Sequence, residues 1–167
     1  MSMVGMPTHG METVFRWART ALAGRPDPSL WTTLDDRLRL ALAQEWVLGT
    51  LGAPDDDLAE DLADEETDNA RFSSMLDDLA SRWSSVYADL RGEFGVLDRS
   101  YIVGVDMELL ILAGPEYVGE SRAGTPIHAH CFIIRFENDE WKIAALARRI
   151  PVPGWPPTEQ TVPDLEL

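Results

Sequence analysis

The sequence predicts an α+β domain, with N-terminal helices packed on a curved antiparallel sheet. Apolar residues recur at the 3.6-residue period of amphipathic helices through residues 13–91. From about residue 100 the period becomes two, and Ile, Val and aromatic residues become frequent, as in strands covered on one face. A chain of 167 residues is long enough for one domain with its own core and short for two.

Helices are expected in residues 13–23, 30–51, 55–68 and 70–91. Gly24 follows the first segment, where a C-cap glycine belongs. The third segment holds nine acidic residues and no basic one, and it lacks the glycine turn of a calcium loop. We therefore interpret it as a short helix with a solvated acidic face. The fourth segment has the most regular helical stripe, formed by Phe72, Leu76, Leu79, Trp83, Val86 and Leu90.

Strands are expected in residues 100–114, 126–136 and 141–150. Side chains alternate between the two faces of a strand, and we expect the apolar face of the first strand to meet the helices. Asp106 and Glu108 then lie on the opposite face. The helix-facing residues are Val103, Val105, Met107, Leu109 and Ile111, with Tyr101 as the protic group that this strand offers a pocket.

A two-residue turn at Asn138 and Asp139 sets the register of the last two strands. Residues directly opposite each other share a face. The pairs expected on the helix-covered face are Phe136–Trp141, Ile134–Ile143, Phe132–Ala145, His130–Ala147 and His128–Arg149.

The large apolar side chains of that face stop before the two histidines, so we expect His128 and His130 at the mouth of an apolar pocket. The predicted ligand-binding residues of this pocket are Phe132, Ile134, Trp141, Trp83 and Tyr87.

Three roles are open for His128 and His130. Imidazole titrates near neutral pH and serves as a general base, with Tyr101 as a hydrogen-bond donor to the substrate. A metal site needs a third ligand, which local spacing does not supply because Cys131 lies on the other face; we expect no metal and no cofactor. The third role is a hydrogen-bonded histidine that lines a cavity without turnover.

Charge and composition exclude several classes of partner. The net charge of −15 repels a phosphate backbone, so we expect no nucleic-acid binding. No apolar run is long enough to span a bilayer, and the N-terminus lacks the features of a secretory signal. The single cysteine, Cys131, fits a core position and a reducing cytoplasm. One lysine among 14 basic residues indicates a GC-rich bacterial genome.

The reverse face of the hairpin carries small or apolar residues that the helices do not cover. Exposed apolar surface of this kind marks a partner site, and two-fold symmetry is the commonest way to bury it. We therefore expect a homodimer through the sheet, formed around Ala129, Cys131, Ile133, Ala144 and Leu146.

Both ends of the chain are expected to be extended arms, at residues 1–11 and 151–167, on either side of a single domain at 12–150. Five prolines exclude a helix in the C-terminal arm. Trp155 is a large aromatic residue whose burial is favourable, so we expect it to hold residues 151–157 against the domain or a partner.

The order of elements and the hairpin sequence PIHAHCFIIRFENDEWKIAAL resemble the nuclear transport factor 2-like superfamily, also called ketosteroid-isomerase-like or SnoaL-like. The resemblance implies a cystatin-like cone around an apolar cavity, and dimers in many members. It implies either small-molecule binding or a lyase or isomerase reaction on a polyketide- or steroid-like carbonyl compound. His128 and His130 match wall positions where its catalysts carry Asp, His or Tyr, whereas no aspartate is found on that face.

Overall fold

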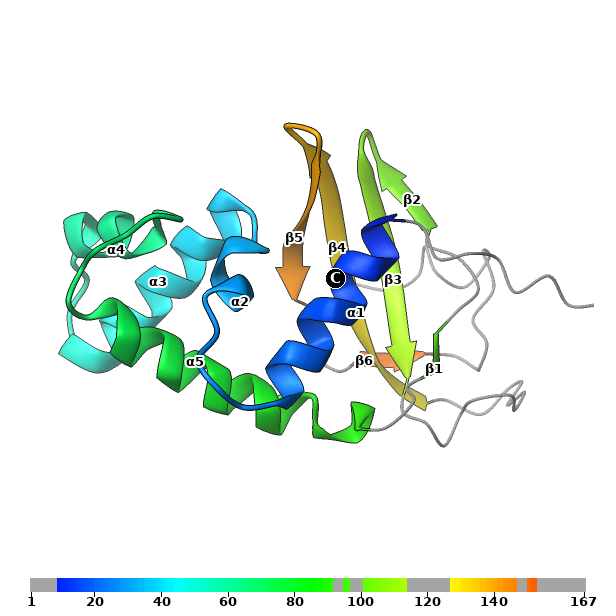
Figure 1. Cartoon of the computed structure of the whole chain (residues 1–167), viewed down its shortest axis with the longest axis horizontal. Coiled ribbons are helices and arrows are strands. Elements are labelled where there is room, and N and C mark those ends of the chain that lie inside the picture. Colours follow the sequence, from blue (N-terminus) through cyan, green and yellow to red (C-terminus); the bar gives the residue numbers. More distant parts are fainter. Residues whose placement is uncertain (1–8, 92–94, 97–100, 114–126, 147–149, 153–167) are drawn as a thin grey trace, which may run out of the picture.

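The structure is a computed structural model that describes residues 9–91, 95–96, 101–113, 127–146 and 150–152 (Figure 1). These residues form an α+β fold, with the helices first and an open antiparallel sheet after them. The helices are α1 (His9–Leu22), α2 (Ser29–Thr32), α3 (Asp36–Leu51), α4 (Asp56–Ala63), α5 (Phe72–Val86) and the 3-10 helix η1 (Ala88–Leu90). The strands are β1 (Gly95–Val96), β2 (Tyr101–Gly104), β3 (Met107–Ala113), β4 (Ile127–Glu137), β5 (Glu140–Leu146) and β6 (Ile150–Val152).

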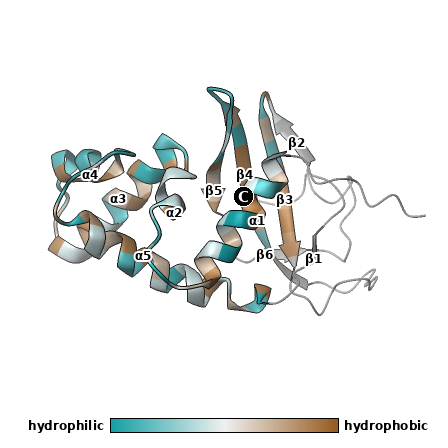
Figure 2. Ribbon diagram, viewed as in Figure 1, coloured by the Kyte–Doolittle hydropathy of each residue, from teal (hydrophilic) through white to brown (hydrophobic). Residues whose placement is uncertain are grey.

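Three long strands, β3, β4 and β5, form the centre of the sheet. The short strands β1 and β2 both pair with β3, and β6 pairs with the start of β4. Figure 1 shows α1 in front of the sheet and α2, α3 and α4 beyond β5, and α1 contacts both β4 and β5. Figure 2 shows β3 and β4 as largely hydrophobic and the tip of the β4–β5 hairpin as hydrophilic.

The core is built around the Trp17 ring, between α1, α5 and β4. Its centroid lies 5.1 Å from that of Trp83, 5.7 Å from Tyr87 and 6.1 Å from Phe132, each in an edge-to-face arrangement. Such aromatic pairs contribute about 0.5–1.5 kcal/mol each beyond the area they bury. The indole nitrogen donates to the Leu30 carbonyl at 3.0 Å, so the buried polar atom is satisfied.

The helix predicted over residues 30–51 is interrupted, and α2 and α3 are separate helices. At the interruption the Ile143 amide donates to the Thr33 carbonyl at 2.9 Å, and the Asp35 amide donates to the Ile143 carbonyl at 2.8 Å. The Asp35 carboxylate also caps α3, because it accepts from the Leu38 amide at 2.8 Å. The expectation of one continuous helix was wrong because the breaking contact comes from β5, far away in the sequence.

The strand predicted over residues 100–114 is the hairpin β2–β3, with Asp106 in the turn at φ 54. Pairing of β3 with β4 places Leu110 opposite Phe132, on the helix-covered face. The alternate residues Met107, Leu109 and Ile111 therefore lie on the reverse face, and Glu108 lies on the helix-covered face. The prediction of which residues of this strand face the helices was thus wrong by one residue. Side chains on both faces of this strand are buried, and Leu109, Leu110, Ile111 and Leu112 are each 0–1% exposed. The sequence therefore lacks the alternation of apolar and polar residues that would show which face meets the helices.

The β4–β5 hairpin confirms the predicted turn, since Asn138 and Asp139 have φ of 52 and 63. The predicted pairs Phe136–Trp141 and Ile134–Ile143 are present. Beyond them Ala144 is an extra residue, so that Phe132 pairs with Leu146 in place of Ala145. Leu146, predicted on the reverse face, therefore shares the helix-covered face with Phe132.

The reverse face is less open than expected. Ala129 and Cys131 are both 0% exposed within a single copy of the chain, whereas Ile133 is half-buried. Burial raises the pKa of the Cys131 thiol to about 12, which leaves it protonated and unreactive at neutral pH. Cys131 is thus a core residue, as its position in an apolar strand indicated.

The ends of the described chain differ from the expected arms. The first helix begins at His9 and Met11 is buried, so α1 includes residues assigned to the N-terminal arm. Pro151 and Val152 belong to β6. Trp155, with the rest of residues 153–167, lies outside the described residues. No helix in the described part of the chain is both long and apolar enough to cross a membrane.

Gly10 lies where α1 comes closest to the hairpin. A β-carbon at this position would overlap Cδ1 of Ile134 and stand 3.1 Å from the Trp141 ring. Ile134 is fully buried and has little room to move. We expect Gly10→Ala to lower the free energy of unfolding by about 1–3 kcal/mol in urea titrations, as overpacking does.

The matched control is Gly49→Ala in α3, where a β-carbon meets no atom within 4 Å. Alanine is the better helix former, so this variant should be more stable by about 0.5–1 kcal/mol. Equal stabilisation by both substitutions would contradict the close packing of α1 on the hairpin.

Candidate functional site

The buried His130 is paired with a partly exposed carboxylate that the sequence did not indicate. It lies on the helix-covered face of β4, opposite Leu112 of β3, and is 0% exposed. Its Nε2 lies 2.8 Å from Oδ1 of Asp89, whose side chain is 29% exposed. Asp89 comes from η1, where the flanking Tyr87 and Leu90 are buried and fix the turn against the sheet.

The other ring nitrogen of His130 has no such partner. Because the Asp89 carboxylate accepts a hydrogen bond, we assign the proton to Nε2, which leaves a lone pair on Nδ1. Nδ1 is buried and has no hydrogen-bond partner among the described residues. The Tyr87 ring lies against the imidazole, with centroids 4.9 Å apart. A buried acceptor without a partner costs about 1–3 kcal/mol, so a hydrogen-bond donor that reached Nδ1 would stabilise this arrangement.

The other two predicted catalytic residues, His128 and Tyr101, are described by their backbone. His128 pairs with Pro151 of β6. Tyr101 pairs with Leu109, which lies on the reverse face, whereas the β3 partner of His130 lies on the helix-covered face. The structure thus brings His130 together with Asp89 and does not pair Tyr101 with the same part of β3.

The described part of the chain places the five predicted ligand-binding residues in three settings. Phe132 and Ile134 are fully buried in the core. Trp83 and Tyr87 reach a groove of about 350 Å³, and Trp141 lines a separate cleft of about 620 Å³. Their apolar stripes correctly predicted the burial of Phe132, Ile134, Trp83 and Tyr87, whereas Trp141 is half-buried.

The groove lies between α3, α5 and β5. Its residues are mostly apolar, and Val86 is its most exposed apolar side chain, at 46%. Burial raises the pKa of Tyr87 above its usual range, so its ring stays neutral in the groove floor. Glu45 and Arg82 form an exposed ion pair at the rim, 3.1 Å apart. The remaining lining residues are Leu42, Trp83 and Leu146.

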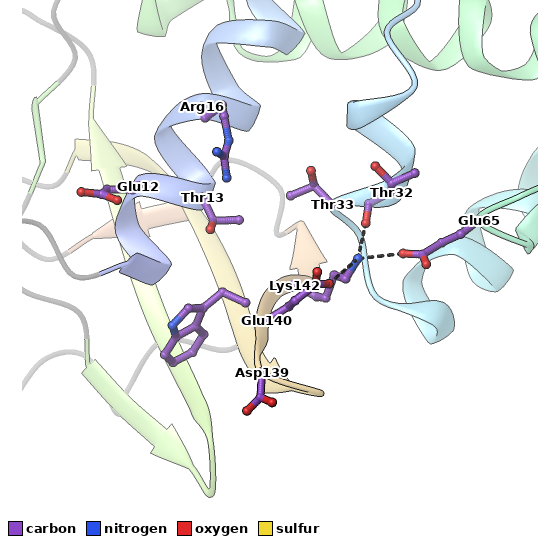
Figure 3. Close-up of a pocket in the computed structure, with 10 residues that line it drawn as sticks. Glu12, Thr13, Arg16, Thr32, Thr33, Glu65, Asp139, Glu140 and Lys142 are labelled. Carbon is purple, nitrogen blue, oxygen red and sulfur yellow. Dashed lines mark hydrogen bonds and ion pairs between the residues drawn. The ribbon is translucent and has the colours of Figure 1, made fainter.

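The cleft is polar and lies between α1, the end of α2 and the β4–β5 hairpin (Figure 3). On one side Lys142 Nζ lies 2.7 Å from Glu65 and donates to the Thr32 carbonyl. Glu65 also pairs with Arg39 at 3.3 Å, and Arg39 donates to the carbonyls of Ala63 and Leu34. This network joins α3 and the segment after α4 to the sheet.

Asp35 is the buried carboxylate of the same region. Burial raises its pKa, and the hydrogen bond from the Leu38 amide and the charge of Arg135, 3.3 Å away, oppose that rise. Its roles in capping α3 and pairing with Arg135 are structural.

A metal centre finds no support in the described residues, which contain no group of three or more His, Cys, Asp or Glu side chains placed to hold an ion. The acidic segment around α4 uses several carboxylates locally: Asp55 caps α4 at the Leu58 amide, 3.0 Å away, and Asp61 accepts from Asn69 at 2.6 Å.

Comparison of the chain with protein-family models, with curated proteins and with solved structures finds no match. The class of protein therefore follows from the fold and geometry above: an α+β protein with a partly buried Asp–His pair, an apolar groove and a polar cleft.

Asp89→Ala tests the Asp89–His130 pair. The substitution leaves both ring nitrogens of His130 unpaired, so we expect the free energy of unfolding to fall by about 1–3 kcal/mol. In a His130→Phe background the same substitution should cost less, because no ring nitrogen remains to be paired. The difference between the two backgrounds, measured by urea unfolding, is the coupling energy. Equal costs in both would contradict the pairing.

Proposed function

We propose that the protein binds a small, mostly apolar ligand in the groove between α3, α5 and β5. The observation that carries this proposal is the mostly apolar lining of the groove, in which the buried aromatic residues Trp83 and Tyr87 lie beside exposed Val86. A volume of about 350 Å³ is at the small end of ligand pockets, which span roughly 300–1,000 Å³. The ligand is therefore a small compound and not a long lipid.

The geometry supports binding more strongly than catalysis. A general base must come within hydrogen-bond reach of the proton it removes. His130 is fully buried, and it does not line the groove or the cleft. Its contact with Tyr87 is nevertheless a direct link to the groove floor, so ligand binding and the Asp89–His130 pair share one side chain.

A second candidate function is a lyase or isomerase reaction on a polyketide- or steroid-like carbonyl compound, favoured by Nδ1 of His130, which has no hydrogen-bond partner among the described residues. Nδ1 would take a proton from the carbon next to the carbonyl, and the electron pair would move onto the carbonyl oxygen. Where the substrate carries a β,γ double bond, return of that proton to the γ-carbon would shift the double bond and give an isomer. This role requires the protein to open at His130, which is fully buried, and the Asp89 carboxylate would stabilise the imidazolium.

The finer architecture that we propose is the cystatin-like cone of the nuclear transport factor 2-like superfamily. Helices on one face of an antiparallel sheet, followed by the long β4–β5 hairpin, support it. We also propose a homodimer through the sheet. The half-buried Ile133 and Ala144 on its reverse face support the dimer, and the complete burial of Ala129 and Cys131 restricts the contact to that part of the face.

Val86→Glu tests the groove. A carboxylate in its wall opposes an apolar ligand, so we expect binding of the dye 8-anilinonaphthalene-1-sulfonate, followed by fluorescence titration, to weaken about tenfold or more. Leu48→Glu in α3 is the matched control, since Leu48 is 51% exposed and does not line the groove. Equal dye binding by the wild type and both variants would contradict the proposal.

A further inference from the structure

The charged side chains around Lys142 compensate one another. The ammonium group lies 2.7 Å from Glu65 and 3.4 Å from Glu140, and it donates to the Thr32 carbonyl. An ammonium has three donor hydrogens, and these three contacts use them. Lys142 is therefore occupied by the protein and does not supply the cleft with a cation for a ligand.

Arg16 is the cation that the cleft does offer. It extends from α1 into the cleft (Figure 3) and is exposed. Its guanidinium makes no hydrogen bond and no ion pair with any described residue. A guanidinium presents a planar fork of N–H donors that matches the two oxygens of a carboxylate. Arg16 is thus suited to hold the carboxylate of a ligand.

Asp139 lies across the cleft from Arg16, at the tip of the β4–β5 hairpin (Figure 3). Its left-handed backbone, at φ 63, is fixed by the two-residue turn. It forms no ion pair within the described part of the chain. Within the described part of the chain, the cleft therefore has a guanidinium without an ion-pair partner on one side and a carboxylate without one on the other.

Trp141 gives the cleft a firm apolar wall. The start of α1 packs against its ring at Gly10, where even a β-carbon would stand 3.1 Å from the indole. Phe136 supports it from the hairpin, with ring centroids 5.2 Å apart at 52°. Trp141 is half-buried by these contacts and still lines the cleft. A side chain of a ligand that spans the cleft can pack on this ring.

From these features we propose that the cleft binds an extended zwitterion, of which a short peptide with free ends is the simplest example. The carboxylate end lies on Arg16, the ammonium end on Asp139, and an apolar side chain on Trp141. A volume of about 620 Å³ is ample for such a compound. This site is separate from the groove, and the proposal does not depend on the apolar ligand proposed there.

The charge of the whole protein favours a zwitterion over a simple anion. A net charge of −15 surrounds the cleft with a negative field that repels anions. A zwitterion carries no net charge, so it reaches Arg16 without that opposition.

The test is isothermal titration of the full chain with the tripeptide Gly-Phe-Gly in three forms: free ends, C-terminal amide, and N-terminal acetyl. We expect the free-ended peptide to bind and each blocked form to bind about tenfold or more weakly, because one charged contact is lost. Arg16→Gln should weaken binding of the free-ended peptide. It should not weaken binding of the C-terminal amide any further, because the amide already lacks the carboxylate that Arg16 holds. Asparagine tolerates the left-handed turn, so Asp139→Asn should keep the hairpin intact. This variant should bind the free-ended peptide more weakly and the acetylated peptide as well as the wild type does.

The matched control is Arg25→Gln, which makes the same charge change at an exposed arginine outside the cleft and should leave binding unchanged. The Val86→Glu variant should also bind the peptide normally, which separates this site from the groove. The proposal is overturned if no form binds at millimolar concentration, if Arg16→Gln binds like the wild type, or if the acetylated peptide binds as tightly as the free one.

Discussion

The fold depends on two main-chain hydrogen bonds at Ile143, where the segment between α2 and α3 joins the edge of β5. The Ile143 amide donates to Thr33 and its carbonyl accepts from Asp35. A sheet edge left open to water is a site for unwanted pairing. A segment of the helical region covers this edge instead, and the buried Ile143 side chain enters the same core as the helices. The helical half and the sheet are thereby parts of one structure.

Both cavities lie beside this junction. The residue before Ile143 is Lys142, whose contacts with Thr32 and Glu65 form one end of the polar cleft. A few residues after it, Leu146 forms part of the apolar groove and pairs with Phe132 in the sheet. One strand therefore separates a polar site from an apolar one. The bulge at Ala144 lets β5 contribute to both sites, because it turns Leu146 onto the helix-covered face.

Sequence reasoning succeeded where the determining contacts are local. The Asn138–Asp139 turn and the first hairpin pairs follow from turn chemistry alone, and the helical stripe of α5 follows from its period. It failed where the partner is distant in the chain or where alternation is lost. The break between α2 and α3 requires Ile143, and the phase of β3 is hidden by apolar residues on both faces.

The candidate site was predicted in part for the same reasons. His130 was identified as inward-facing, because hairpin register determines its face. Asp89 was missed, since it lies at the end of a helical stripe where nothing in the spacing links it to a strand far along the chain. Among the described residues, those predicted to line one pocket are divided between the core, the groove and the cleft; apolar stripes indicate which side chains are buried, and they do not indicate whether the buried space is filled.

Native-state hydrogen exchange of the Ile143 and Asp35 amides tests the central claim that helices and sheet form one unit. The account predicts that both amides open with the same free energy as the slowest amides of α5, that is, by global unfolding. Exchange of the Ile143 and Asp35 amides through a lower-energy opening, while α5 stays protected, would contradict it. The sheet edge would then detach without the helices unfolding.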